Sequence, residues 1–74
     1  MNKTKFTIAI IGAGYMAEEH IKVFSSMQEF EIIGIHSRTI SKAQLLANKF
    51  NIPVVVENLS NIYEKTKANL LIIA

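Results

Sequence analysis

Short β-branched runs alternate with amphipathic segments along almost the whole chain, and this alternation restricts the possible folds more than any other feature. The apolar runs at 6–11, 31–36, 54–56 and 70–74 have the length and composition of buried strands. Helical periodicity lies between them, and strands joined by helices form parallel sheets through right-handed crossovers. The chain is therefore predicted to be α/β, a Rossmann-type doubly wound parallel sheet that is incomplete (β-α-β-α-β-α-β).

The predicted helices carry local start and stop signals. The first runs from Tyr15 to about residue 28, and the second opens with Ser41 and Gln44 at the spacing of a capping box. Asn51 suits the left-handed position after a helix, and either Asn58 or Ser60 caps a brief third one. The apolar positions expected to face the sheet are Ala13, Met16, Ala17, Ile21, Phe24 and Met27, then Ala43, Leu46, Ala47 and Phe50, then Leu59, Ile62, Tyr63 and Thr66.

The length and the apolar end of the sequence indicate that it is part of something larger. A chain of 74 residues buries a small core, and without cysteine it has neither disulfides nor zinc thiolates for support. The run from Leu70 to Ala74 has the character of a strand buried on both faces. We expect the chain to be the N-terminal piece of a longer protein.

Charge and hydropathy exclude several classes of partner. The net charge is only +2 and the lysines are scattered, so no nucleic-acid footprint is present. The apolar runs are far shorter than the roughly 18 residues of a membrane span, and no signal-peptide core is recognisable. We therefore expect a soluble protein of the cytoplasm that binds neither nucleic acid nor membrane.

A glycine motif follows the first predicted strand and opens the first predicted helix. Residues 12–17, Gly-Ala-Gly-Tyr-Met-Ala, match the pattern Gly-x-Gly-x-x-Gly/Ala in the context that a dinucleotide-binding site requires. Gly12 permits the tight turn, Gly14 leaves room for a pyrophosphate, and Ala17 lets the helix approach the strand. Backbone N–H groups near Gly14, Tyr15 and Met16 favour an anion, whereas the Met16 side chain is interpreted as core filler. The alternative is a purely structural glycine turn.

The end of the second strand indicates which dinucleotide is bound. NAD-selective sites place Asp or Glu there to accept from the ribose 2′-hydroxyl, but this chain has Ser37, Arg38 and Thr39. The two hydroxyls can donate to a 2′-phosphate, and the guanidinium can pair with it and stack on adenine. NADP is therefore favoured over NAD, with an ordinary polar loop as the alternative. The ligand is expected at the carboxyl ends of the first and last strands, where the strand order reverses.

Catalytic and metal-binding groups are not recognisable. The sequence has no Asp, and its only histidines, His20 and His36, lack partners at metal-ligand spacing and are interpreted as structural. Glu18 and Glu19 are interpreted as a solvated helix face. The chain thus holds a candidate binding site, with no catalytic residue and no metal site.

The ordered set of motifs resembles the start of the Gfo/Idh/MocA oxidoreductases, which include glucose-fructose oxidoreductase and inositol dehydrogenase. The resemblance lies in residues 6–17, His20, 33–39, 41–43, 51–53 and 71–74. It implies an N-terminal Rossmann domain, here residues 1–74 of it, and a C-terminal α/β substrate domain absent from this chain. It also implies hydride transfer between NAD or NADP and a sugar, cyclitol or sugar-nucleotide substrate, in a homo-oligomer.

The same resemblance assigns roles residue by residue. It implies pyrophosphate contacts at Gly12, Gly14, Tyr15 and Met16, and adenosine-ribose contacts at residues 37–39. The family's catalytic Lys, in a Glu-Lys-Pro motif, and its later His or Asp partner would lie beyond Ala74. The chain departs from the family at Asn69, where Asp is frequent.

Two other functions remain open from the sequence. One is a non-catalytic dinucleotide-binding module, such as a redox-sensing regulator, because Rossmann folds serve both purposes. The other is a flavin or S-adenosylmethionine site, which explains residues 37–39 less well.

Overall fold

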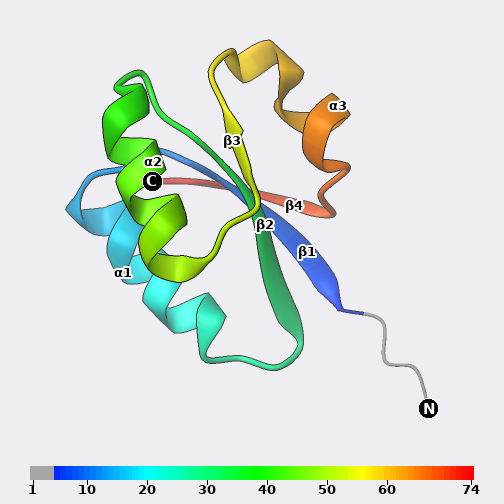
Figure 1. Ribbon diagram of the computed structural model, residues 1–74. Coiled ribbons are helices and arrows are strands. Elements are labelled where there is room, and N and C mark those ends of the chain that lie inside the picture. Colours follow the sequence, from blue (N-terminus) through cyan, green and yellow to red (C-terminus); the bar gives the residue numbers. More distant parts are fainter. Residues whose placement is uncertain (1–4) are drawn as a thin grey trace.

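Residues 5–74 are described by a computed structural model in which strands and helices alternate from end to end (Figure 1). Residues 1–4, which the predicted domain of residues 1–74 includes, lie outside this description. The strands are β1 (Phe6–Ile11), β2 (Phe30–His36), β3 (Val54–Val56) and β4 (Leu70–Ile73). The helices are α1 (Tyr15–Ser25), α2 (Ile40–Phe50) and α3 (Ile62–Thr66), with a 3-10 turn η1 (Leu59–Asn61) before α3. The predicted order of an incomplete Rossmann-type fold is confirmed.

The strands form one parallel sheet in the order β3-β2-β1-β4. The chain moves outward from β1 to β2 and β3, then returns to the other side of β1 to form β4. The strand order therefore reverses between β1 and β4, as expected from the sequence. Figure 1 shows α1 and α2 on one side of the sheet and α3 on the other.

Two apolar clusters separate the sheet from its helices. The larger one packs α1 and α2 against the sheet through Ile8, Ile10, Ala17, Ile21, Ile32, Ile35, Ala43, Leu46, Ala47 and Ile52. The smaller one lies on the α3 face and consists of Ala9, Val56, Ile62 and Ala68. Because β1 contributes alternate residues to the two clusters, its centre is fully buried. This rigid central strand leads directly into the glycine motif.

Strand β2 is irregular where α3 approaches it. Ile8 pairs with Ile32 and Ala9 with Gly34, so the register slips past Ile33. At Gly34 a Cβ atom would collide with the Thr66 Cγ2 methyl, which leaves no room for a larger residue. The missing side chain thus lets the short helix α3 lie against the sheet.

Helix α1 ends earlier than its periodicity predicts. Its last residue is Ser25 instead of a residue near 28, because the chain tightens after Val23. The Ser26 hydroxyl donates to the Val23 carbonyl at 2.7 Å, and the Met27 N–H donates to the Phe24 carbonyl at 3.1 Å. These bonds satisfy carbonyls that another helical turn would have used.

The predicted capping box of α2 is wrong, whereas its predicted end is confirmed. The N-cap is Thr39, whose carbonyl accepts from the N–H groups of Lys42 and Ala43, so Ser41 lies inside the helix. At the other end Asn51 has φ 58° and ψ 44°, the left-handed conformation expected there.

Several residues expected in the core are exposed. Met16 on α1 and Tyr63 on α3 are 56% and 60% exposed. Met27, which lies after the end of α1, and Leu59, which lies in η1, are 40% and 47% exposed. Asn58 does cap η1, since its side chain accepts from the Ser60 N–H at 3.1 Å.

Strand β4 is formed by the apolar run at the end of the chain, which has the character of a strand buried on both faces. It is an edge strand that pairs only with β1 within residues 5–74, and most of its side chains remain exposed. None of the helices in this part of the chain has the length and hydropathy needed to cross a membrane.

Candidate functional site

A cleft of about 440 Å³ opens at the carboxyl ends of the strands, beside the reversal of strand order. Strand ends, the loop after β1, the loop after β2 and the start of α2 all contribute to its walls. Its lining residues are Ile11, Gly12, Ala13, Gly14, His36, Ser37, Arg38, Thr39, Lys42, Leu59, Ile73 and Ala74. The cleft thus brings together five of the seven predicted site residues, namely Gly12, Gly14 and residues 37–39.

The two glycines of the motif differ in what surrounds them. Gly12 has φ +125°, donates its N–H to the His36 carbonyl at 2.7 Å, and would bring a Cβ to 2.9 Å from the Ala74 carbonyl oxygen. The fold itself therefore requires glycine at residue 12. A Cβ at Gly14 would meet no atom within 4 Å. Protein packing does not explain Gly14, and the open space beside it suits an approaching ligand.

Helix α1 begins directly at this open space. Gly14 is its N-cap and has no side chain to accept from the first-turn N–H groups. The first intrahelical bond runs from the Glu18 N–H to the Gly14 carbonyl at 3.0 Å, so the preceding N–H groups have no acceptor inside the helix. An 11-residue helix adds its positive dipole end at the same place. The arrangement favours an anionic group beside Gly14.

The side chains of Tyr15 and Met16 lie outside the cleft lining. Both are largely exposed, at 73% and 56%, so the interpretation of Met16 as core filler is wrong. Only their backbone N–H groups are positioned at the helix start.

The loop between β2 and α2 holds its residues in a turn at the mouth of the cleft. The Ser37 hydroxyl oxygen accepts from the Thr39 N–H at 3.1 Å, which leaves the hydroxyl hydrogen available for an acceptor on a ligand. Arg38 is exposed and lines the same cleft. Ser37, with a hydroxyl that can donate, and Arg38, with its guanidinium, therefore line the same cleft.

Two residues of the cleft lining lie outside the set of ligand contacts that the sequence predicted. Lys42, in the first turn of α2, adds a second cation to the lining, and no spacing signal in the sequence indicated it, because Arg38 precedes the helix. His36, the last residue of β2, is also among the lining residues, and its buried Nδ1 lies 2.9 Å from the Val56 carbonyl oxygen, which agrees with its interpretation as a structural histidine. The cleft is thus more cationic than residues 37–39 alone suggest, and no carboxylate side chain contributes to its lining.

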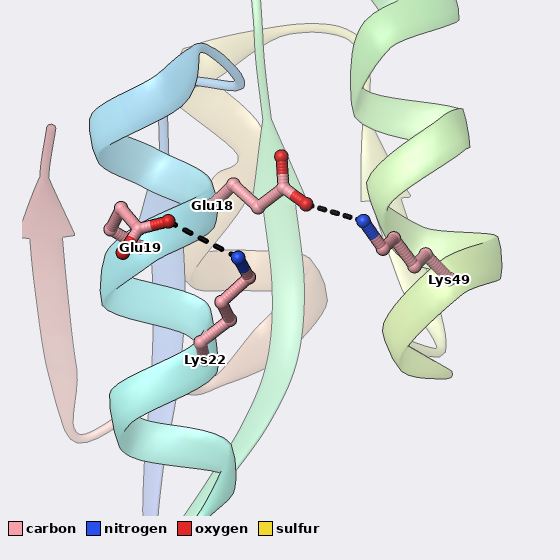
Figure 2. A network of polar contacts seen from close by, with 4 residues as sticks. All are labelled: Glu18, Glu19, Lys22 and Lys49. Carbon is pink, nitrogen blue, oxygen red and sulfur yellow. Dashed lines mark hydrogen bonds and ion pairs between the residues drawn. The ribbon is translucent and has the colours of Figure 1, made fainter.

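Two ion pairs involve side chains of α1, and one of them joins α1 to α2, as Figure 2 shows. Glu18 on α1 bonds to Lys49 on α2 at 2.5 Å, and this bond lowers the pKa of the Glu18 carboxyl. Glu19 bonds to Lys22 within α1 at 3.2 Å, and this bond raises the pKa of the Lys22 ammonium. Both glutamates thus pair with lysines, and neither belongs to the residues that line the cleft. Within residues 5–74, no three His, Cys, Asp or Glu side chains gather in a metal-binding group.

Comparison with known proteins assigns residues 6–74 to one family. The model of an oxidoreductase family with an NAD-binding Rossmann fold, GFO_IDH_MocA, matches residues 6–74. No curated protein matches the sequence.

Solved structures share the fold at low sequence identity. One is myo-inositol dehydrogenase from Lactobacillus casei in complex with NAD(H) and myo-inositol, with a TM-score of 0.88, 14% identity, and coverage of 96% of this chain and 22% of that one. Another is an oxidoreductase from Agrobacterium radiobacter in complex with NAD+, L-tartaric acid and magnesium, with a TM-score of 0.88, 20% identity, and coverage of 96% and 21%.

A third is a myo-inositol dehydrogenase from Corynebacterium glutamicum, with a TM-score of 0.82, 21% identity, and coverage of 95% of this chain and 21% of that one. The present chain therefore spans about a fifth of the length of these structures.

Proposed function

The chain belongs to the Gfo/Idh/MocA oxidoreductase family, with its NAD-binding Rossmann fold, and from this premise we propose that it forms the nucleotide-binding part of an NAD(P)-dependent oxidoreductase. Residues 1–74 would be the N-terminal part of the dinucleotide-binding domain, and a substrate domain would follow in a longer chain, called here the intact protein. The observation that carries the proposal is the cleft in which Gly12 and Gly14 face Ser37 and Arg38 at the reversal of strand order.

The residues of this chain would bind and orient the cofactor, whose nicotinamide supplies the hydride chemistry when bound. The open space at Gly14 accommodates a pyrophosphate, because an added Cβ there meets nothing within 4 Å. N–H groups near Gly14, Tyr15 and Met16 would donate to it from the start of α1. Gly12 keeps the turn tight enough for this approach.

The charges of the cleft favour a preference for NADP over NAD. Arg38 and Lys42 line it, the Ser37 hydroxyl has its hydrogen available, and no carboxylate in the lining can accept from a ribose 2′-hydroxyl. A 2′-phosphate would gain charge-assisted hydrogen bonds of about 1.5–3 kcal/mol each from such cations. Thr39 completes the turn as the N-cap of α2. This preference distinguishes the chain from the neighbours whose structures contain NAD.

We further propose a polyol substrate of the sugar, cyclitol or sugar-nucleotide class for the intact protein. The support is the fold shared with two myo-inositol dehydrogenases. A homo-oligomer in the cytoplasm, without nucleic-acid or membrane partners, belongs to the same proposal.

The test is calorimetric titration of NADP(H) and NAD(H) into the intact protein and three variants. Arg38→Ala should weaken NADP(H) binding by about one to two orders of magnitude, because each 1.4 kcal/mol is about tenfold, and should affect NAD(H) much less. Ser37→Asp should shift the preference toward NAD(H) by repelling the phosphate and accepting from the hydroxyl. Lys22→Ala removes the same charge as Arg38→Ala from a residue outside the cleft lining and serves as the matched control.

Equal losses of NADP(H) and NAD(H) affinity in Arg38→Ala would contradict the NADP preference while leaving dinucleotide binding intact. Failure of the wild-type protein to bind either cofactor would contradict the proposed function itself. An equal loss of NADP(H) affinity in Lys22→Ala would mean that Arg38→Ala acts through the net charge of the protein and not through a contact in the cleft.

A further inference from the structure

Asn69, the residue before β4, bonds to Thr7 near the start of β1, and the proposed function gives neither residue a role. The Thr7 N–H donates to Asn69 Oδ1 at 3.0 Å, and the Thr7 hydroxyl donates to the same oxygen at 3.2 Å. The Asn69 N–H in turn donates to the Thr7 carbonyl at 3.0 Å and to Thr7 Oγ1 at 3.1 Å. Two residues 62 positions apart in the sequence are thus joined through their backbones and their side chains.

The apolar pattern of β4 does not fix the register of this strand on β1. All four residues of β4 are Leu or Ile, and successive side chains point to opposite faces of the sheet. A slip of one residue exchanges the two faces of a strand, which normally moves polar side chains into the core. In β4 it would only replace Leu and Ile by Ile and Leu. The polar bonds between Thr7 and Asn69 therefore distinguish the observed register, in which Ile8 pairs with Leu70, from its neighbours.

The register of β4 determines where its carboxyl end meets the glycine turn. The Ala74 N–H donates to the Ile11 carbonyl at 3.0 Å, and the Ala74 carbonyl oxygen lies 2.9 Å from the place of a Cβ at Gly12. Ile73 and Ala74 both line the cleft. Because a strand rises about 3.3 Å per residue, a slip of one residue would displace this wall of the cleft by about that distance.

The strand order divides the cleft into three parts, because the end of β1 lies between the ends of β2 and β4. In the proposed function, the pyrophosphate lies against Gly14 after β1, and the adenosine ribose lies at Ser37 and Arg38 after β2. The nicotinamide half of the dinucleotide would then extend over the end of β4, beside Ile73 and Ala74.

We infer that Thr7 and Asn69 are positioning residues for the nicotinamide half of the cofactor. They hold the register of β4 on β1 and so place Ile73 and Ala74 at the cleft from the opposite end of the strand. This inference rests on the proposed function. Neither Thr7 nor Asn69 lines the cleft, so their effect on a ligand passes through β4. Loss of the pair should weaken binding of the whole dinucleotide and spare a ligand without the nicotinamide half, whereas a loosened fold would weaken both.

The experiment is calorimetric titration of the intact protein with NADP(H) and with adenosine 2′,5′-bisphosphate, which lacks the nicotinamide half. Asn69→Ala removes the oxygen that accepts from Thr7, and Thr7→Val replaces the hydroxyl by a methyl group. Asn69→Asp keeps an accepting oxygen and Thr7→Ser keeps the hydroxyl, so these are the conservative variants. Asn48→Ala removes an exposed amide that bonds to Gln44 at 3.0 Å outside the cleft lining, and it is the matched control.

We expect NADP(H) affinity to fall about tenfold in Asn69→Ala and in Thr7→Val, while affinity for the bisphosphate stays within about twofold of wild type. The conservative variants and the control should bind both ligands as wild type does. Equal losses for the two ligands, or no loss for either, would overturn the inference and leave the proposed function standing. If wild type binds only NAD(H), the same comparison uses NAD(H) and AMP. If wild type binds no dinucleotide, the proposed function fails first.

A second measurement on wild type covers the case in which the disruptive variants unfold. Coupling between two sites is reciprocal, so a ligand that depends on the register of β4 must also stabilise the Thr7–Asn69 pair. Saturating NADP(H) should therefore slow hydrogen exchange of the Thr7 N–H more than saturating bisphosphate does. The reference is the Phe6 N–H, which donates to the Glu29 carbonyl at 2.9 Å and not to Asn69. A ratio of Thr7 to Phe6 exchange rates that is the same in both complexes would overturn the inference.

Discussion

The three glycines of the chain differ in the space around them. This difference indicates which of them the fold requires and which a ligand would require. Gly12 would drive a Cβ against the Ala74 carbonyl oxygen, and Gly34 would drive one against the Thr66 methyl. Gly14 faces open space within the cleft. Substitutions at Gly12 and Gly34 should therefore reduce stability, whereas a substitution at Gly14 should reduce ligand affinity.

Gly34 and Thr66 form a pair whose coupling can be measured. Gly34→Ala should destabilise the fold by about 1–3 kcal/mol, the typical effect of overpacking a filled core. Thr66→Ser removes the Cγ2 methyl that a Cβ at residue 34 would collide with, and it keeps the hydroxyl that donates to the Ile62 carbonyl at 2.6 Å. In the double variant the loss caused by Gly34→Ala should shrink by about 1 kcal/mol or more. Chemical denaturation of the four proteins gives the coupling energy.

Additive losses in that cycle would contradict the close approach of α3 to β2. The single variant Thr66→Ser provides the control, because it shows the effect of losing the methyl alone.

At the residue scale, the sequence identifies contacts that follow from a motif and misses those that follow from packing. Gly12, Gly14, Ser37, Arg38 and Thr39 are recognisable because a strand end fixes their position relative to the sheet. Lys42 lines the cleft from the first turn of α2, which begins at Ile40, one residue before Ser41, the N-cap that the sequence predicted. His36 depends on a bond to Val56, 20 residues away, which no local pattern reveals.

At the scale of elements, α1 and α2 are joined by a bond that depends on pH. Lys49 donates to Glu18 and lowers the pKa of that carboxyl below its ordinary 4.5 (Figure 2). A lowered folded-state pKa means that the stabilisation is complete above pH 4.5 and is lost as pH falls through the folded value. Lys49→Met should therefore make stability less sensitive to acid.

The measurement is the thermal midpoint of the intact protein between about pH 2.5 and about pH 6. Lys5→Met, which removes the same charge from the residue before β1, is the control and should retain the wild-type slope. Identical acid profiles for Lys49→Met and wild type would show that the pair is too well solvated to contribute.

Element types are predictable from the sequence, whereas their boundaries depend on single hydrogen bonds. Strands β1 and β3 begin and end where β-branched runs do. Helix α1 ends early because the Ser26 hydroxyl takes the Val23 carbonyl. Helix α2 starts early because Thr39 is extended, with φ −105° and ψ 97°, and Ser and Thr are comparable N-caps.

At the scale of the whole molecule, the main feature is the exposed edge of the sheet formed by β4. Strand β4 leaves Leu70, Leu71 and Ile73 exposed by 41%, 46% and 78%, and an edge strand presents unpaired N–H and C=O groups. The sequence predicts the strand, and its exposed side chains agree with its place at the edge of the sheet in this chain.

The isolated 74-residue chain should consequently be marginally stable or self-associating. Its core is small and its apolar edge can template pairing with a second copy. Sedimentation and urea denaturation of the 74-residue chain measure both properties. A monomer with a steep, cooperative unfolding transition would contradict this prediction and show that the chain is a self-sufficient domain.

The central claim is that the cleft binds a dinucleotide whose pyrophosphate lies against Gly14, and Gly14→Val tests it most directly. Gly14 has φ −87° and ψ −163°, an extended conformation that Val adopts readily, and no atom lies within 4 Å of an added Cβ. The variant should therefore keep its circular dichroism spectrum, while its branched side chain fills the space that the ligand needs. In calorimetric titration of the intact protein, NADP(H) affinity should fall by about tenfold or more. An unchanged affinity in a folded Gly14→Val protein would contradict the account.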